Sequence, residues 1–366
     1  MQAVIRSWTR GRLQELLGVR YPVVQGPFGA GPSTVELTAA VSNAGGLGSY
    51  GAHALAPDRL APLVAQLRAA TSRPFAVNLW LPQPGEVDLR ISDAELARHL
   101  APLRPYLAEV GLPEPTRADL VRPDYHAQIE VLLAAEPPVI SFTMGVPEPA
   151  VLAEARRRGI VTFGNAATVD EAVALAEAGV DAVVASGSDA GGHRGSFLGP
   201  AEESMVGTFS LVPQVADAVP VPVVAAGGVA DARGVVAALA LGADAVQIGT
   251  GFLITEKSGA SPAHKRALAG PAARATVLTR AFSGRYARGI PNRLQRELDA
   301  LPEPVPGYPL QNLLTQALRR TANERGLPDL IHLWSGQAAP LAVARPAADY
   351  LASLVADVRT LLGIDG

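Results

Sequence analysis

One histidine stands in a glycine-rich stretch directly after a run of small, β-forming residues. The stretch AVVASGSDAGGHRGSFLG runs from Ala182 to Gly199, and His193 lies between Gly192 and Arg194. With an ordinary pKa of about 6.5, an imidazole can take or hold a proton at neutral pH. The glycines beside it let a ligand approach the backbone closely. We therefore take His193 as the candidate catalytic residue, although a lone histidine can also be purely structural.

Two further glycine-rich segments follow later apolar runs. Gly227 and Gly228 come after VPVVAA and precede a helix that begins near Asp231, and Gly249 and Thr250 follow DAVQI. Loops without Cβ atoms expose backbone N–H groups, and a following helix N-terminus adds partial positive charge. Each pair alone would also suit a tight turn. Two pairs at adjacent positions predict a phosphate site.

Asn78 interrupts an otherwise hydrophobic run, FAVNLW. Burying its amide without hydrogen-bond partners costs about 1–3 kcal/mol. A flat heterocycle with paired donors and acceptors would supply such partners. A core asparagine that bonds only to the protein is the alternative.

The remaining histidines have weaker cases, because they lie in predicted helices, inserted segments or the C-terminal region. They are His53, His99, His126, His264 and His332. No pair of histidines has HxxxH spacing, so we predict no metal site. The chain has no cysteine, which excludes disulfides and thiolate chemistry and suits a reducing cytoplasm.

The elements that must position these residues are short β-branched runs alternating with alanine-rich helical segments. Several runs are continuously apolar, as expected of parallel strands covered on both faces. The eight runs are residues 21–25, 46–50, 75–80, 138–142, 160–164, 181–186, 221–228 and 244–250.

The segments between the strands carry helix signals. Glycine follows four of them, at Gly45, Gly159, Gly179 and Gly242, and suits a left-handed C-cap. Thr168 and Asp231 stand at N-cap positions, and TVDE resembles a capping box.

Eight strands with intervening helices predict an α/β fold, a (β/α)8 barrel. A doubly wound sheet is the alternative, because a strand count does not show closure. The carboxyl ends of barrel strands form the active-site mouth, which is where the polar and glycine residues gather.

Two regions interrupt the β/α rhythm. Residues 81–127, between the third and fourth strands, are rich in proline, leucine and charge, and predict a helical insertion over the mouth. We therefore expect a barrel over residues 20–256 with the insertion after strand 3. We expect a mostly helical C-terminal extension over residues 257–366, packed on the barrel.

Composition limits the class of protein. The 366 residues are 48% hydrophobic and 18% charged, with net charge −3. This balance disfavours nucleic acid or an anionic membrane as the main partner. The N-terminus does not resemble a signal peptide, and no apolar stretch is long enough to span a membrane. We expect a soluble, cytoplasmic protein.

Taken together, the motifs resemble the nitronate monooxygenase family, formerly the 2-nitropropane dioxygenases. These are FMN-dependent TIM barrels related to flavin-dependent enoyl-ACP reductases. The resemblance covers most of the chain and rests on PVVQGPFGAG, NAGGLGSYGA, FAVNLW, SFTMGVP, GSDAGGHRG, PVVAAGGVAD, ALGADAVQIGTGFL, TRAFSGRYARGIPN and LWSGQ.

The resemblance implies a set of FMN-binding positions and a role for His193 as a base or substrate-orienting residue. The expected FMN-binding residues are Gly26, Pro27, Phe28, Asn78, Ser186, Gly191, Gly227, Gly228, Gln247, Ile248, Gly249 and Thr250. Where this chain has Gly26 and Phe28, the family often has alanine and methionine. Where it has Ser186, the family commonly has glutamine, and this departure bears on flavin tuning and substrate choice.

The implied reaction is oxidation of an alkyl nitronate, or of a nitroalkane, by dioxygen to a carbonyl compound and nitrite. The partners are then a small-molecule substrate and dioxygen, and the family implies a homodimer. Three alternatives stay open: an FMN-dependent NAD(P)H oxidoreductase acting on a quinone or enoyl thioester, a non-catalytic flavin- or phosphate-binding barrel, and a flavin-free barrel acting on a sugar phosphate. Ser283, Arg285, Tyr286 and Arg288 are candidates for the mouth or for a solvated loop.

Overall fold

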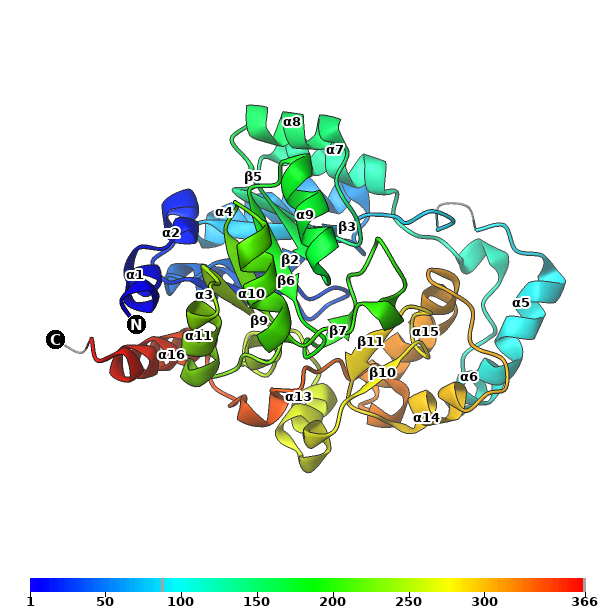
Figure 1. Ribbon diagram of the computed structural model, residues 1–366. Coiled ribbons are helices and arrows are strands. Elements are labelled where there is room, and N and C mark those ends of the chain that lie inside the picture. Colours follow the sequence, from blue (N-terminus) through cyan, green and yellow to red (C-terminus); the bar gives the residue numbers. More distant parts are fainter. Residues whose placement is uncertain (87–88, 365–366) are drawn as a thin grey trace.

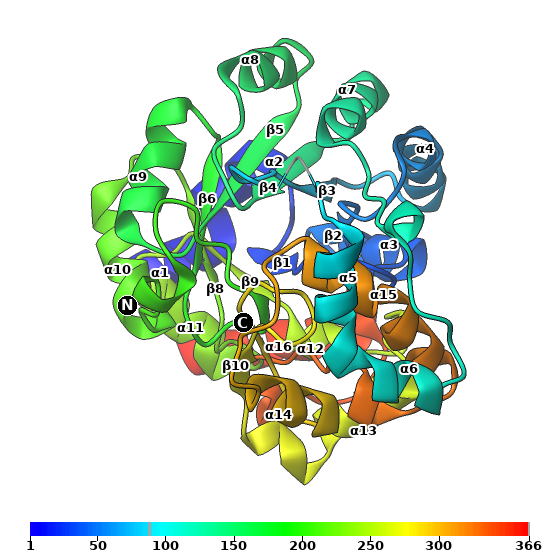
Figure 2. The same ribbon diagram turned by 90° about the vertical axis from the view of Figure 1, so that its right-hand side faces the viewer.

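Eight parallel strands ringed by helices form the centre of the molecule (Figures 1 and 2). The computed structural model describes residues 1–86 and 89–364, so residues 87 and 88 of the predicted insertion lie outside the described part. The strands are β1 (Val23–Gln25), β2 (Gly48–Gly51), β3 (Phe75–Trp80), β4 (Val139–Thr143), β5 (Val161–Ala166), β6 (Ala182–Ser186), β8 (Val223–Ala226) and β9 (Ala245–Ile248).

The hydrogen-bonded order of these strands is β1-β9-β8-β6-β5-β4-β3-β2, with every neighbouring pair parallel. A parallel bridge between Val24 and Leu47 joins β1 to the segment that leads into β2, at the two ends of this order. The predicted (β/α)8 barrel is thereby confirmed, and an open doubly wound sheet is wrong. Each predicted run overlaps a barrel strand, and β1, β2 and β8 begin two residues later than expected.

Side chains alternate along each strand between the barrel interior and the helix layer, as the period of two requires. In β6, Ala182 and Val184 belong to the interior cluster, whereas Val183 and Ala185 pack in the large outer cluster. Leu13, which is fully buried, lies in the same interior cluster and closes the amino end of the barrel.

The helices begin and end where the sequence signals predict. Thr168 and Asp231 accept backbone N–H groups as N-caps, and all four C-terminal glycines have positive φ. TVDE is not a capping box, because the Glu171 carboxylate accepts from the N–H of Ala167 instead of Thr168. The helices of the barrel layer are α3 (Val35–Asn43), α4 (Leu60–Ala70), α7 (Tyr125–Ala135), α8 (Pro149–Arg157), α9 (Val169–Ala178), α10 (Thr208–Ala218), α11 (Ala232–Ala240) and α16 (Ala347–Leu362).

The helix α16 packs between α11 and α3, so it takes the eighth place in the ring (Figure 1). The sequence division into residues 20–256 and 257–366 stays a prediction about domains. At the other end of the chain, α1 (Gln2–Arg10) packs against α11, and α2 (Arg12–Leu17) follows it.

The segment between β3 and β4 forms α5 (Asp93–Leu100) and α6 (Arg104–Glu109) before α7. Their apolar residues share one buried cluster with the C-terminal segment, beside α14 (Arg293–Asp299) and α15 (Leu310–Glu324) (Figure 1). The segment also contains α12 (Thr250–Leu253) and α13 (Pro262–Ala269).

A second, antiparallel sheet joins this segment to the barrel. Its order is β10 (Val277–Thr279), β11 (Ala287–Gly289) and β7 (Gly192–His193). No helix in the described part of the chain is long and apolar enough to cross a membrane.

Candidate active site

A layer of polar side chains lies above the apolar interior of the barrel, at the carboxyl ends of the strands. The alternation that turns Ala76 and Val184 inward also turns Asn78 of β3 and Ser186 of β6 inward. In β4 the same parity selects Ser141 and, one step further, Thr143. In each of these strands, the inward-facing position that follows the last apolar one is polar. Together these positions form the floor of the mouth.

Asn78 is 3% exposed, and its Nδ2 donates to the Ser141 carbonyl and hydroxyl at 3.1 and 3.0 Å and to Thr143 Oγ1 at 3.2 Å. Its Oδ1 has no hydrogen-bond partner among the described residues. The protein thus satisfies one half of this amide and leaves the acceptor half available to a ligand. Sequence reasoning missed Ser141 and Thr143, although their alternate positions in VISFT are a readable signal.

The predicted phosphate loops lie next to each other, because β8 and β9 are neighbours in the barrel. Gly227 and Gly228 have φ of 103° and 72°, values that favour glycine. The backbone N–H groups of Gly228, Thr250 and Gly251 find no acceptor among the described residues. Thr250 also begins α12, which points its N-terminus at this place. These unpaired donors fit an anion.

We call the backbone N–H groups of Gly228, Thr250 and Gly251 the cradle. Two other segments of the chain pack against it. Thr250 Oγ1 accepts from the N–H of Gly336 at 3.0 Å, and the N–H of Gln337 donates to the Asp189 carbonyl at 3.0 Å. A Cβ on Gly191 would lie 2.4 Å from the nitrogen of Gly336, so backbone meets backbone there. The predicted residue Gly191 and the late LWSGQ motif are therefore brought together.

A tyrosine of α16 packs against the cradle. The Tyr350 hydroxyl donates to the Ala230 carbonyl at 2.6 Å, just beyond the Gly227–Gly228 turn. The same hydroxyl would be 2.3 Å from a Cβ on Gly251. Tyr350 thus contacts both loops that supply the unpaired donors.

The first predicted loop, Gly26 to Phe28, also reaches this place. The N–H of Gly26 donates to the Ile248 carbonyl at 2.9 Å, and a Cβ on Gly26 would lie 3.2 Å from the Cα of Gly249. A Phe28 ring carbon would lie 3.9 Å from a Cβ on Gly249. Pro27 lies between them and is half-buried.

The side chains of the two predicted binding residues on β9, Gln247 and Ile248, point to opposite faces of the sheet. The Ile248 side chain is fully buried in the outer cluster, so it packs away from the mouth and leaves only backbone there. Gln247 has the interior parity of Ala245, is half-buried, and makes no side-chain hydrogen bond with a described residue. On β6, the Ser186 carbonyl accepts from Arg194 at 3.1 Å.

His193 is not in an irregular loop, as the sequence suggested, but in the two-residue strand β7. It pairs with Ala287 of β11, and its Nε2 lies 2.8 Å from the Ser283 hydroxyl oxygen. Ser283 is 1% exposed and Arg288 is also buried. The FSGRYARG segment therefore lines the mouth, and a solvated loop is wrong for Ser283 and Arg288.

Aromatic rings surround the imidazole. The edges of Trp80 and Trp334 meet His193 with ring centroids 4.9 and 5.3 Å away. On its other side Trp80 stacks on His53 at 3.8 Å. His53, which the sequence ranked lower, thus joins the site, and its buried Nδ1 has no hydrogen-bond partner in the part of the chain that the structure describes. No local signal in the sequence marked this stack.

Burial governs the titration of this histidine cluster. Burial lowers the pKa of His193 well below its ordinary value, and the positive charge of Arg285 lowers that pKa further. Burial also lowers the pKa of His53 to about 4. Both rings are therefore neutral at neutral pH, the state in which an imidazole can accept a proton.

The loop that carries His193 is held by two buried charges. Arg194 is 1% exposed and donates to the carbonyls of Ser186, Gly187 and Ser204. The Glu171 carboxylate accepts from three backbone N–H groups, two of them just beyond Arg194. Gly195 passes over the mouth, where its Cβ would meet the Asn165 amide at 2.2 Å.

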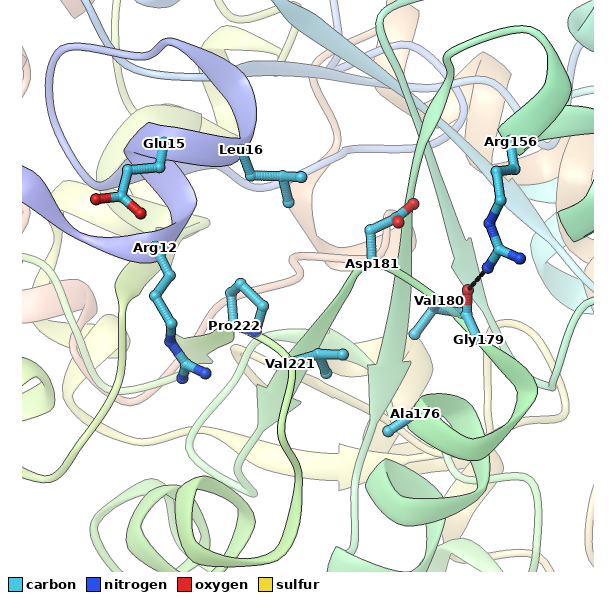
Figure 3. A pocket seen from close by; sticks show the side chains of 10 residues that line it. All are labelled: Arg12, Glu15, Leu16, Arg156, Ala176, Gly179, Val180, Asp181, Val221 and Pro222. Atoms are coloured by element: carbon cyan, nitrogen blue, oxygen red, sulfur yellow. Dashed lines mark hydrogen bonds between the residues drawn. The ribbon is translucent and has the colours of Figure 1, made fainter.

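A cavity of about 640 Å³ opens at the opposite end of the barrel, at the amino ends of β6 and β8 (Figure 3). Its two arginines have partners: Arg12 bonds to Asp244 through two contacts of 2.8 and 2.7 Å, and Arg156 donates to the Gly179 carbonyl. It is therefore not the predicted site. In the described part of the chain, no three His, Cys, Asp or Glu side chains are grouped to hold a metal.

Comparison with known proteins agrees with this geometry. The nitronate monooxygenase family model matches residues 10–357. A probable nitronate monooxygenase of Staphylococcus aureus (strain Newman) is 39% identical over 356 residues, covering 97% of this chain and 99% of that relative.

Two solved structures show the same arrangement. A nitroalkane oxidase from Streptomyces ansochromogenes is 39% identical, with a TM-score of 0.86, over 96% of this chain and 99% of its own. FabK from Thermotoga maritima is 29% identical, with a TM-score of 0.75, over 97% of both chains. The residues at the mouth, the barrel and these similarities lead to one conclusion: the chain belongs to the nitronate monooxygenase family and is an oxidoreductase.

Proposed function

We propose that this enzyme binds FMN and oxidises alkyl nitronates, and the nitroalkanes that give rise to them, with dioxygen to a carbonyl compound and nitrite. The observation that carries the proposal is a neutral, partly buried His193 at the same barrel mouth as a cradle of unpaired backbone N–H groups. The family consists of flavoenzymes, which supports a flavin as the occupant.

The cradle fits the phosphate of a mononucleotide. Gly228, Thr250 and Gly251 would donate backbone N–H groups to it. Asn78 Oδ1 would accept a hydrogen bond from the ring system. When bound, FMN supplies the electron transfer between substrate and dioxygen that side chains do not provide.

The protein's own residues would handle the proton and the anion. His193 would accept the proton from the carbon next to the nitro group, and the electron pair of that C–H bond would move into the nitro group to give the nitronate. This step requires a neutral imidazole, and burial, which lowers the pKa of His193, keeps the ring neutral while making it a weaker base. Trp80 and Trp334 would exclude water from the reacting carbon.

A spectrum followed by anaerobic mixing tests the proposal. The purified protein should show flavin absorbance, released FMN should be identified by chromatography, and ethyl nitronate should bleach the flavin in the absence of oxygen. Aerobic turnover should then yield nitrite. A protein without flavin, or a flavin bleached by NADPH and untouched by nitronate, would contradict it, and the second result would favour the NAD(P)H oxidoreductase alternative.

We further propose a soluble, cytoplasmic homodimer, as the sequence analysis expects. Sedimentation of the purified protein would give the mass of a dimer, and a monomer at micromolar concentration would contradict this.

A further inference from the structure

We propose that Ser283 sets the tautomer of His193, so that Nε2 carries the ring proton and Nδ1 is the atom that accepts the substrate's proton. The inference deepens the proposed function and rests on His193 acting as a base there. It makes Ser283 a positioning residue, since its hydroxyl touches the histidine and not the reacting carbon.

The hydroxyl of Ser283 has three polar neighbours. His193 Nε2 lies at 2.8 Å, the Arg285 carbonyl oxygen at 3.1 Å and the Arg285 amide nitrogen at 3.4 Å. A hydroxyl donates one hydrogen bond and accepts two. The carbonyl can only accept, so the Ser283 hydroxyl donates its hydrogen bond to it. The amide N–H donates to one of the two lone pairs of the hydroxyl oxygen.

The remaining lone pair of Ser283 faces Nε2, which must therefore carry a proton. This assignment pairs every one of these groups, as buried polar groups require. In the opposite tautomer Nε2 carries no proton and would accept the hydrogen bond of the Ser283 hydroxyl. The Arg285 carbonyl would then lose that hydrogen bond. A bare Nδ1 then remains, and it has no hydrogen-bond partner among the described residues.

The turn that carries the hydroxyl is rigid, so the assignment does not depend on a mobile side chain. Thr315 of α15 donates to the Phe282 carbonyl at 2.5 Å, and Gln311 donates to the Ala281 carbonyl at 2.6 Å. Gly284 has a φ of 81°, and a Cβ there would lie 2.4 Å from a backbone oxygen of residue 306. The β7–β11 pairing fixes His193 against the same turn.

Charged and titratable groups surround the ring from each neighbouring segment. They are Arg285 beyond the turn, His53 after β2, Arg319 on α15 and His332 before Trp334. All are cationic or neutral, and none is an acceptor that competes with Ser283 for the Nε2 proton. Arg319 instead donates towards Nδ1 of His332 at 3.2 Å.

The test measures the tautomer directly. In long-range ¹H–¹⁵N spectra of the purified enzyme labelled at histidine, a bare ring nitrogen resonates well downfield of a protonated one. The His193 signals, assigned by their loss in His193→Gln, should show bare Nδ1 and protonated Nε2. Ser283→Ala should give a mixture of tautomers, and Ser283→Thr, which keeps the hydroxyl, should restore the single form.

Kinetics supply a second readout. Ser283→Ala should lower kcat/KM on neutral nitroethane by about tenfold, the loss expected when roughly a tenth of the His193 rings keep the active tautomer. It should change kcat/KM on preformed ethyl nitronate by less than about threefold, because that substrate needs no proton removal. The matched control is Ser42→Ala on α3, whose buried hydroxyl likewise donates to a carbonyl and accepts an N–H.

A wild-type His193 protonated at Nδ1 would overturn the inference, as would a Ser283→Ala spectrum identical to that of wild type. Either result could stand beside normal nitronate turnover, which would leave the proposed function intact. Conversely, an enzyme with the expected tautomer and no turnover of nitronate or nitroalkane would refute the proposed function and retain the role of Ser283.

Discussion

The two ends of the barrel use polar groups in opposite ways. At the amino end Arg12 and Asp244 form a two-contact ion pair, and Asp244 also accepts the N–H of Val223. At the carboxyl end the N–H groups of Gly228 and Thr250 find no acceptor within residues 1–86 and 89–364. A polar group that bonds within the protein contributes to stability, and one left unpaired at a mouth is available to a ligand.

The largest expected effect is at the mouth. Replacing His193 with glutamine removes the base but keeps a polar side chain of similar length. Turnover of neutral nitroethane should fall by about 10²–10⁴-fold, and turnover of preformed nitronate should fall much less. Nitrite release from the two substrates measures this, with the exposed His126→Gln as control. Equal losses on both substrates would deny His193 the role of base.

Acid should weaken the mouth before it weakens the amino end. Burial lowers the pKa of His53 and of His264 to about 4, below the value of about 6.5 in an unfolded chain. Between these values the unfolded chain binds protons that the folded chain does not. The free energy of unfolding should therefore fall as pH falls from 6.5 to 4, by roughly 1 kcal/mol per pH unit for each histidine.

Urea unfolding at a series of pH values measures that slope, and His264→Gln should make it shallower by one histidine. Hydrogen exchange should show the loss of protection first in the segment around β11. If exchange protection were lost first around Arg12 and Asp244, the two ends of the barrel would not differ in acid sensitivity as predicted.

The cradle offers a test of intermediate size. A Cβ on Gly228 would have room, since its nearest neighbour is 3.5 Å away, but it would strain a φ of 72° and crowd a bound phosphate. We expect Gly228→Ala to weaken FMN binding by about tenfold, measured by fluorescence during dialysis. Gly326→Ala is matched for φ, at 68°, with open space around its Cβ, and should bind FMN normally. Equal affinity in both variants would remove Gly228 from the cradle.

The smallest effect on chemistry should come from the amino end. Arg12→Ala leaves the buried Asp244 carboxylate without its cation and should cost about 1–2 kcal/mol of unfolding free energy, reduced because Arg12 is half exposed. FMN affinity and turnover should stay unchanged. Urea unfolding and flavin titration check the two halves of the statement. A variant that loses flavin without losing stability would show that the two ends are coupled.

Much of the fold follows from the sequence because its signals are local. Apolar runs of five to eight residues and glycines after helices mark strands and turns by their own chemistry, and the order of strand ends gives His193 and Gly228 their place at the mouth. The parity of β4 would also have located Ser141.

The partners of the histidine could not be predicted in this way. Ser283 lies 90 residues from His193 in the chain, and the stack of His53 on Trp80 joins two different strand ends. The first contact depends on how the C-terminal segment folds back over the barrel, and the second on how the residues after β2 turn towards the end of β3. A single sequence contains no periodic signal for either. The flavin roles of the predicted residues stay predictions until a bound cofactor is measured.

The position of Tyr350 on α16 affects when the enzyme can acquire its cofactor. On a ribosome the last barrel strand, β9, is synthesised about a hundred residues before this tyrosine, so a nascent chain has all eight strands and no brace beneath its two loops. Loading should then follow release of the finished polypeptide, and a product shortened before residue 350 should emerge colourless even where its strands have assembled.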